Sequence, residues 1–331
     1  MAGDTTPAIV LPRGHVLARP EPWMTSDLVA LVHACDIATI GVADFSADDV
    51  RDWFDAAFTS AARDGWVVHT ARGRLVAWAY LESQYDDRRE DATVYVHPKA
   101  HTGLFRPLVE LLIRRSAERA AEGGREENTL HFWWTRGEVE LERAARLAGA
   151  RFLRRFARMH RLLTGAERPV PPPSGVRVRG VDHTDEAAMR AFHRVVLEAF
   201  SELPGGQAAA YEAWRAHIAA AKTMPYDEWL VAEVGGRPVG VLQTADTSTD
   251  LTGWVRNLGV LRPHRRRGIA RNLLENVFAT FARKGYTSAG LTVDIGDDPG
   301  EMRVYESAGM ELLYESEIWQ LVVRAEAPTA G

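Results

Sequence analysis

The segment Leu258–Ala270, LGVLRPHRRRGIA, combines a short apolar run with a cluster of arginines and a glycine. Its pattern Arg265-x-x-Gly268-x-Ala270 stands where a predicted strand passes into a predicted helix. The first turn of a helix presents N–H groups without intrahelical partners and the positive end of the helix dipole, which together favour phosphate. Gly268 has no Cβ, so a diphosphate can approach its backbone closely. Charge and donors suited to phosphate come from Arg265, Arg266, Arg267 and Arg271.

The two common nucleotide-binding loops do not account for this turn. A Walker A loop needs Gly-Lys followed by Ser or Thr, and a dinucleotide fingerprint needs three glycines spaced G-x-G-x-x-G; the chain has neither. An arginine cluster by itself also fits a solvated basic surface or an RNA contact. The strand before the cluster and the helix after it favour the phosphate turn.

Hydrophobic periodicity predicts the elements that position this turn. Asp182 is expected to cap a helix that runs to Phe200, and Gly235-Gly236 predicts a hairpin between two strands. The predicted order in the second half is helix 182–200, helix 207–221, strands 229–234, 238–245 and 254–260, helix 269–284, strand 288–293, helix 302–308 and strand 312–323.

The first half predicts the same order of elements: helix 46–63, strands 66–70, 75–81 and 92–96, helix 104–121, strand 129–134, helix 139–147 and strand 152–163. A long-period repeat of this kind indicates one α/β (α+β) fold used twice. Between the halves, Pro171–Pro173 favours a stiff extended segment. We therefore expect an N-terminal domain over 1–165, a Pro-rich linker over 166–175 and a C-terminal domain over 176–331.

The phosphate turn resembles that of the GNAT superfamily of N-acetyltransferases. The family signature is Arg/Gln-x-x-Gly-x-Gly/Ala after a strand, and Arg265, Gly268 and Ala270 satisfy it. A second block, VDIGDDPGEMRVYESAGM from Val293 to Met310, resembles the family pattern that ends in Tyr-x-x-x-Gly-Phe: Tyr305 and Gly309 match, Met310 replaces Phe, and Asp297 stands where Asn is usual. The resemblance implies two tandem GNAT-like domains, each a mixed, mostly antiparallel, twisted sheet flanked by helices. In its tandem architecture the chain is similar to the mycothiol synthases.

The resemblance also implies roles for individual residues. The backbone of Leu258, Gly259 and Val260 would pair with the pantetheine amides of acetyl-CoA. The N–H groups from Arg266 to Arg271, including Ile269, would hold the pyrophosphate, Asp297 would contact the pantetheine arm, and a backbone N–H near Val260 would stabilise the oxyanion. Tyr305 would protonate the departing thiolate, because a phenol with a pKa of about 10 stays protonated at neutral pH.

The general base is not identified by the sequence. Some members of the family use a Glu in the strand before the signature, and by spacing that position is Trp254 here. Glu228, Asp246, His217 and a chain of waters are the alternatives.

The first half departs from the same motifs. Its turn reads Ala100-x-x-Gly103-x-Phe105, and Ala145 stands where the tyrosine would be, four residues before Gly149. We expect a degenerate domain that stabilises the second half, with weaker CoA binding if any.

Composition sets the remaining expectations. The 331-residue chain has a formal net charge of −5, which gives no reason to expect nucleic acid or an anionic membrane as a partner. It has a single cysteine, Cys35, expected in the core, and its histidines show no metal-ligand spacing, so no metal is expected. No signal peptide or spanning segment is apparent, which favours a cytoplasmic protein. Heavy use of Arg, Ala and Gly with little Lys indicates a bacterial coding bias.

The expected activity is acetyl transfer from acetyl-CoA to a primary amine of a small molecule bound in a cleft, in a ternary complex without a covalent acyl-enzyme. The alternatives are a non-catalytic acyl-CoA sensor or scaffold, an acetyltransferase of protein N-termini, and an RNA- or protein-binding module. The sequence leaves self-association open.

Overall fold

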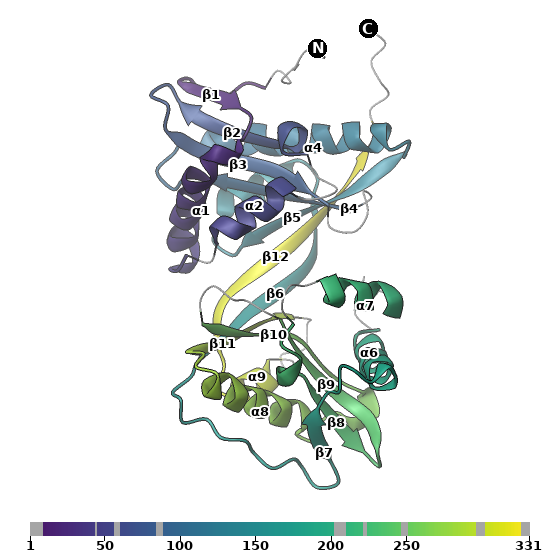
Figure 1. Ribbon diagram of the computed structural model, residues 1–331. Coiled ribbons are helices and arrows are strands. Elements are labelled where there is room, and N and C mark those ends of the chain that lie inside the picture. The colour runs from purple at the N-terminus through teal and green to yellow at the C-terminus, as the bar shows by residue number, and fades with distance from the viewer. Residues whose placement is uncertain are drawn as a thin grey trace. The chain divides into compact units, whose positions relative to one another are not determined.

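The computed structural model describes residues 9–43, 45–55, 60–83, 89–201, 210–220, 224–245, 251–295 and 302–325. The chain forms two compact units (Figure 1). Unit 1 comprises Met1–Arg155 and Tyr314–Gly331, and unit 2 comprises Phe156–Leu313.

Unit 1 is built on a six-stranded sheet in the order β1-β2-β3-β4-β5-β12. All its neighbouring strands are antiparallel except β4 and β5, which run parallel. Its elements are β1 (His15–Ala18), α1 (Thr25–Ile40), α2 (Ala47–Asp55), α3 (Ala61–Asp64), β2 (Gly65–Thr70), β3 (Leu75–Glu82), β4 (Arg89–Val96), α4 (Phe105–Glu122), β5 (Glu127–Thr135), α5 (Val139–Leu147) and β12 (Glu311–Arg324).

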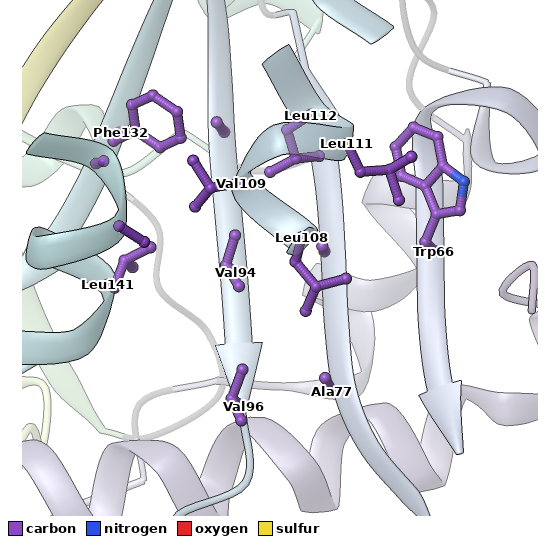
Figure 2. Close-up of a cluster of buried hydrophobic side chains, with 14 of the residues drawn as sticks. Trp66, Ala77, Val94, Val96, Leu108, Val109, Leu111, Leu112, Phe132 and Leu141 are labelled. Atoms are coloured by element: carbon purple, nitrogen blue, oxygen red, sulfur yellow. The ribbon is translucent and has the colours of Figure 1, made fainter. Parts of the chain in front are cut away.

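The core of unit 1 lies between α4 and one face of this sheet (Figure 2). Leu108 and Leu112 of α4 lie against Val94 of β4 and Phe132 of β5, and all four side chains are buried. A smaller cluster, formed by α1 and α2 with Trp78 of β3, covers the opposite face. The sheet is therefore buried on both faces, which explains why its central strands are almost continuously apolar.

Unit 2 repeats this plan with a sheet in the order β6-β11-β10-β9-β8-β7. Again one neighbouring pair, β10 and β11, is parallel and the others are antiparallel. The elements are β6 (Arg151–Leu162), β7 (Arg177–Gly180), α6 (Glu186–Phe200), α7 (Tyr211–Ala220), β8 (Leu230–Val234), β9 (Arg237–Ala245), β10 (Thr252–Val260), α8 (Ile269–Arg283), β11 (Ser288–Asp294) and α9 (Arg303–Ser307).

Helices cover both faces of this second sheet. Leu273, Val277 and Phe281 of α8 are buried against strands that include β9 and β11. On the other face, Phe192 and Val196 of α6 pack with residues of β8 and β9. These two layers define an α8 face and an α6 face of the sheet.

The last strand of each half of the chain joins the sheet of the other half. β6 follows α5 but pairs with β11, and β12 follows α9 but pairs with β5. The compact units therefore divide the chain at 155/156 and 313/314, unlike the sequence-based division at 166–175. The proline segment lies inside unit 2, where the side-chain amides of Asn272 and Asn276 donate to the carbonyls of Pro171 and Val170 over 2.9 and 3.1 Å.

The two tandem, mixed and mostly antiparallel sheets confirm the predicted fold class, and the predicted elements match the observed ones closely. The expected cap at Asp182 is wrong. Asp185 caps α6 by accepting from Ala187 N–H, whereas the carboxylate of Asp182 accepts the N–H and hydroxyl of Thr184 in the preceding turn. The predicted helix 46–63 is observed as α2 and α3, with 56–59 outside the described residues.

Candidate active site

A gap opens between the two parallel strands of unit 2. β10 and β11 pair from Thr252 with Ser288 to Val255 with Leu291. Both strands continue beyond that point, β10 to Val260 and β11 to Asp294, and among the described residues the ladder between them does not. The edge of β10 from Arg256 to Val260 therefore faces the gap, as an edge to which an extended ligand can add.

A β-bulge in β10 lies where the strands separate. The register between β9 and β10 shifts between Val255 and Asn257, so Arg256 is the additional residue. Bulges bend a strand and redirect its side chains. The bulge therefore marks the inner end of the gap.

The end of α6 lies against the open part of β10. A Cβ on Gly259 would lie 2.8 Å from the Cβ of Ala199. Such a separation is too short for two carbon atoms, so this contact requires glycine. Gly259 thereby lets Ala199 and Phe200 form one wall of the gap.

The turn at the outer end of the gap has the left-handed backbone that glycine favours. Gly268 is the N-cap of α8 with φ +77°, and Arg266 is also left-handed with φ +59°. The first bond of α8 runs from Asn272 N–H to the carbonyl of Gly268, so the N–H groups of Ile269, Ala270 and Arg271 precede the helical ladder. Consecutive N–H groups in such a turn form a concave site for an anion.

The arginines of the turn differ in what they do. Arg265 does not extend freely toward a ligand: its Nε donates to the carbonyl of Val260 over 3.0 Å and its Nη2 donates to that of Ala199 over 3.3 Å. It therefore ties the turn to β10 and α6. Arg271 pairs with Glu275 one helical turn later, and Arg267 contacts His264.

One cavity of about 650 Å³ joins these features. Leu291 and Val293 belong to the core on the α8 face, and Thr292 and Asp294 alternate with them toward the α6 face. All four line the cavity, which therefore passes through the sheet between the strands. Its other lining residues are Ala199, Phe200, Val255, Arg256, Leu258, Gly259, Val260, His264, Arg265, Arg266, Gly268, Ile269, Ala270, Arg271, Arg303, Val304, Tyr305 and Ser307.

Tyr305 reaches this cavity from α9. Its ring packs on the buried cluster under α8, and it is partly exposed. The backbone N–H of Met310 donates to its carbonyl over 3.0 Å, and Gly309, with φ +76°, turns the chain into β12. The short helix thus holds the phenol at the gap.

The cavity brings together every residue of the predicted site except two. Arg267 is not among its lining residues, and Asp297 lies outside the described residues. The sequence reasoning missed Arg256, His264, Asp294, Arg303, Ala199 and Phe200. A signal existed for Asp294 and Arg303, which belong to the second family block, and for His264, which belongs to the arginine-rich segment. No signal existed for Arg256, Ala199 and Phe200, because a bulge or a helix end cannot be read from periodicity.

The position where some members of the family place a carboxylate holds Trp254, as expected. Its ring lies over Gly290, where a Cβ would be 2.6 Å from it, and the Arg158 guanidinium lies 3.8 Å from the ring centroid. Glu228 is buried, pairs with Lys284 over 2.9 Å, and is not among the residues that line the cavity. Asp246 and the side chain of His217 lie outside the described residues.

The corresponding turn in unit 1 is built differently. Counted from the first helical residue, Leu104 and not Gly103 occupies the place of Gly268, with right-handed φ −77° and a fully buried side chain. Ala145 does occupy the place of Tyr305: Ala150 N–H donates to its carbonyl over 3.0 Å, the bond that Met310 makes with Tyr305.

Comparison with known proteins agrees with this geometry. The model of the acetyltransferase (GNAT) family matches residues 189–310. This segment is a GNAT acetyltransferase domain. It includes β10, the turn before α8, and Tyr305. A search of curated proteins found no match.

Solved structures share the fold over both units. A GCN5-related N-acetyltransferase from Sphaerobacter thermophilus has a TM-score of 0.80 and 25% identity, over 96% of this chain and 98% of that chain. A tandem GNAT protein from the clavulanic acid biosynthesis pathway has a TM-score of 0.64 and 15% identity, over 95% and 100%. A glucosamine N-acetyltransferase region of a fungal GH3 β-N-acetylglucosaminidase has a TM-score of 0.62 and 12% identity, over 96% and 39%. With the family match, they confirm the predicted tandem GNAT architecture and the N-acyltransferase class.

No helix in the described parts of the chain has the length and apolar character needed to cross a membrane. Within the same residues, no group of three His, Cys, Asp or Glu side chains is arranged to hold a metal ion.

Proposed function

We propose that unit 2 transfers an acetyl group from acetyl-CoA to the primary amine of a small molecule, directly and within a ternary complex. One observation carries the proposal: a single cavity joins a left-handed, arginine-rich helix N-terminus, an open strand edge and the phenol of Tyr305. A diphosphate, an extended amide-containing arm and a leaving thiolate need these three features in this order.

The proposed roles follow the geometry. The N–H groups at the start of α8 hold the diphosphate, the edge of β10 orients the pantetheine arm, and Asp297 contacts that arm. Because the cavity passes through the sheet, the acceptor amine reaches the thioester from the α6 face while acetyl-CoA occupies the α8 face.

The chemistry is balanced by two proton movements. The neutral amine forms a C–N bond to the acetyl carbon while the C–S bond breaks. Tyr305 gives its phenolic proton to the thiolate, and the proton that leaves nitrogen passes to solvent, which reprotonates the phenolate. The products are the N-acetyl compound and CoA thiol.

Unit 1 is proposed to be a degenerate copy that supports unit 2 and binds CoA weakly if at all. The loss of the left-handed N-cap and of the phenol, replaced by Leu104 and Ala145, supports this assignment.

The test is Tyr305→Phe in the full chain, assayed by thiol release with acetyl-CoA and a panel of primary amines. We expect turnover to fall about 100-fold, the range for loss of a general acid, with CoA affinity within twofold of the wild-type value. Tyr95→Phe, which removes a phenol from β4 of unit 1, is the matched control and should leave turnover unchanged.

Three outcomes would contradict the proposal. Unchanged turnover in Tyr305→Phe would remove Tyr305 as the acid. CoA binding without thiol release for any amine would indicate a sensor. Turnover with peptide N-termini alone would indicate a protein acetyltransferase.

A further inference from the structure

The diphosphate of acetyl-CoA accounts for only some of the charged side chains that line the cavity. Five arginines line it, and Asp294 is its one carboxylate among the described residues. Arg265, Arg266 and Arg271 belong to the turn at the start of α8, where the proposed diphosphate lies. Arg256 does not: it lies four positions before Val260, about 13 Å along the strand at 3.3 Å per residue.

Arg256 therefore lies at the end of the cavity where acetyl group and acceptor meet. It is the additional residue of the β10 bulge, and its side chain is exposed. In the described part of the chain no hydrogen bond or ion pair engages its guanidinium. A diphosphate held at the other end does not explain this cation.

Asp294 lines the same cavity from the opposite strand. It lies three residues beyond Leu291, the last β11 residue that pairs with β10. A guanidinium on one strand and a carboxylate on the other thus border the gap from its two sides.

The surroundings add positive charge on the acceptor side. Trp254 and Gly290 pair across the ladder, and the Trp254 ring lies on the α6 face with Arg158 stacked on it at 3.8 Å. The place of a family carboxylate is therefore taken by an aromatic ring with a guanidinium stacked on it.

We infer that the acceptor is an amine that also carries an anionic group, a carboxylate or a phosphate. Arg256 binds the anionic group and Asp294 attracts the amino group, which fixes the nitrogen near the thioester. This assignment rests on the proposed acetyl transfer and narrows its acceptor to amino-acid-like compounds. Polycationic amines are disfavoured because they bring further positive charge to a cavity that is already rich in arginine.

Matched acceptors test the assignment directly. The pairs are phenylalanine and phenethylamine, and O-phosphoethanolamine and ethanolamine, with spermidine as the polycation. Thiol release with acetyl-CoA should show a kcat/KM at least tenfold higher for the anionic member of one pair or of both, since hydrogen bonds between charged groups are the strong ones. The two pairs distinguish carboxylate from phosphate.

The variant Arg256→Gln should lower that preference about tenfold through the acceptor KM, with the KM for acetyl-CoA within twofold. Arg256→Lys should retain part of the preference because it keeps the charge. Arg237→Gln, at the exposed first residue of β9, makes the same charge change away from the cavity and should have no effect.

A wild-type enzyme that prefers the uncharged members or spermidine overturns the assignment, and so does an unchanged preference in Arg256→Gln. If no amine releases thiol, the proposed transfer fails, and calorimetry on the CoA-loaded protein decides the inference separately. Binding of the anionic members that Arg256→Gln weakens would support the site, and equal binding of both members of each pair would overturn it.

Discussion

The helix N-termini that follow β4 and β10 differ in whether their backbone N–H groups are hydrogen-bonded within the turn. In unit 1, Gly103 N–H donates to Nδ1 of His101 over 2.9 Å, Leu104 N–H donates to the His101 carbonyl over 3.1 Å, and Phe105 N–H donates to the carbonyl of Thr102. The donors that a phosphate would need are thus used within the turn. In unit 2 the N–H groups of Ile269, Ala270 and Arg271 follow the left-handed Gly268 and lie outside the helical ladder, so the difference between the units lies in the backbone as much as in the arginines.

β10 and β4 also differ in the residue at equivalent positions near their ends, Gly259 in unit 2 and Tyr95 in unit 1. Gly259 faces Val241 across the ladder, and Tyr95 faces Trp78 in the corresponding position of unit 1. The glycine lets α6 approach and leaves room beside β10. The tyrosine instead packs on Trp78 with ring centroids 6.0 Å apart, and the thiol of Cys35 from α1 donates to the Val96 carbonyl at 3.4 Å. Unit 1 closes with its own side chains the space that unit 2 leaves to a ligand.

The largest effect is expected from Gly268→Val. A β-branched residue at φ +77° is strongly strained, and relief of that strain would redirect the N–H groups of the turn. We expect CoA affinity to fall at least 100-fold, measured by calorimetry on the folded protein.

Gly103→Val makes the same substitution in the turn of unit 1, at the glycine that precedes the N-cap Leu104. The nearest atoms to a Cβ there belong to the His101 side chain, at 2.8 and 2.9 Å, which can move. Affinity within twofold of wild type is expected. If both variants lost affinity equally, or if Gly268→Val retained it, the contrast between the two turns would not concern CoA.

Much of this contrast was accessible from the sequence. The motif residues Arg265, Gly268 and Tyr305 are spaced by local elements, and local periodicity predicted those elements within a few residues. Ala145 was correctly identified as the unit 1 equivalent of Tyr305 for the same reason. Gly103 was aligned with Gly268 because both are glycines, but the two turns between strand and helix have the same length, and the backbone shows that Leu104 is the N-cap of α4 as Gly268 is of α8.

A smaller effect is expected from Gly259→Ala. The added Cβ would lie 2.8 Å from that of Ala199 and 3.4 Å from the Phe200 ring, so the end of α6 must shift. We expect the KM for acetyl-CoA to rise about tenfold, in the range for overpacking a close contact. The double variant Gly259→Ala/Ala199→Gly removes the opposing methyl group and should restore most of the loss. Failure of this rescue would show that α6 does not set the width of the gap.

The features that sequence reasoning missed depend on long-range contacts. Arg256 is part of the cavity only because the β9–β10 register shifts, and Phe200 only because α6 ends beside β10. The pairing of β6 with β11 and of β12 with β5 was missed because each of these strands comes at the end of its own half of the sequence. Periodicity reports which face of an element is buried and does not report which partner buries it.

The smallest expected effect concerns a carboxyl in unit 1 near the end of β5. Burial raises the pKa of Glu138 to about 7, with a further rise from the charge of Asp36, while the Thr135 N–H that donates to it over 2.7 Å acts in the opposite direction. Burial and the Asp36 charge outweigh the Thr135 hydrogen bond, and no arginine charge from the described residues offsets them, so the folded state favours the protonated form of Glu138.

The sign of the pH dependence follows from that preference. The folded protein binds the Glu138 proton up to about pH 7, whereas the unfolded chain releases it near the ordinary value of 4.5. Glu138 therefore makes the free energy of unfolding fall as the pH rises through this window. Glu138→Gln keeps an acceptor for Thr135 N–H and carries no charge, so at pH 8 we expect it to stabilise the protein by about 1 kcal/mol, or about 2–4 °C in Tm, and to have little effect at pH 4.5. Glu140→Gln makes the same change on α5, and it should alter the free energy of unfolding equally at pH 8 and at pH 4.5. If the free energy of unfolding of Glu138→Gln followed that of the wild type in parallel at all pH values, this carboxyl would be ionised in the folded protein. Unit 1 would then tolerate a buried charge without the arginines that line the cavity of unit 2.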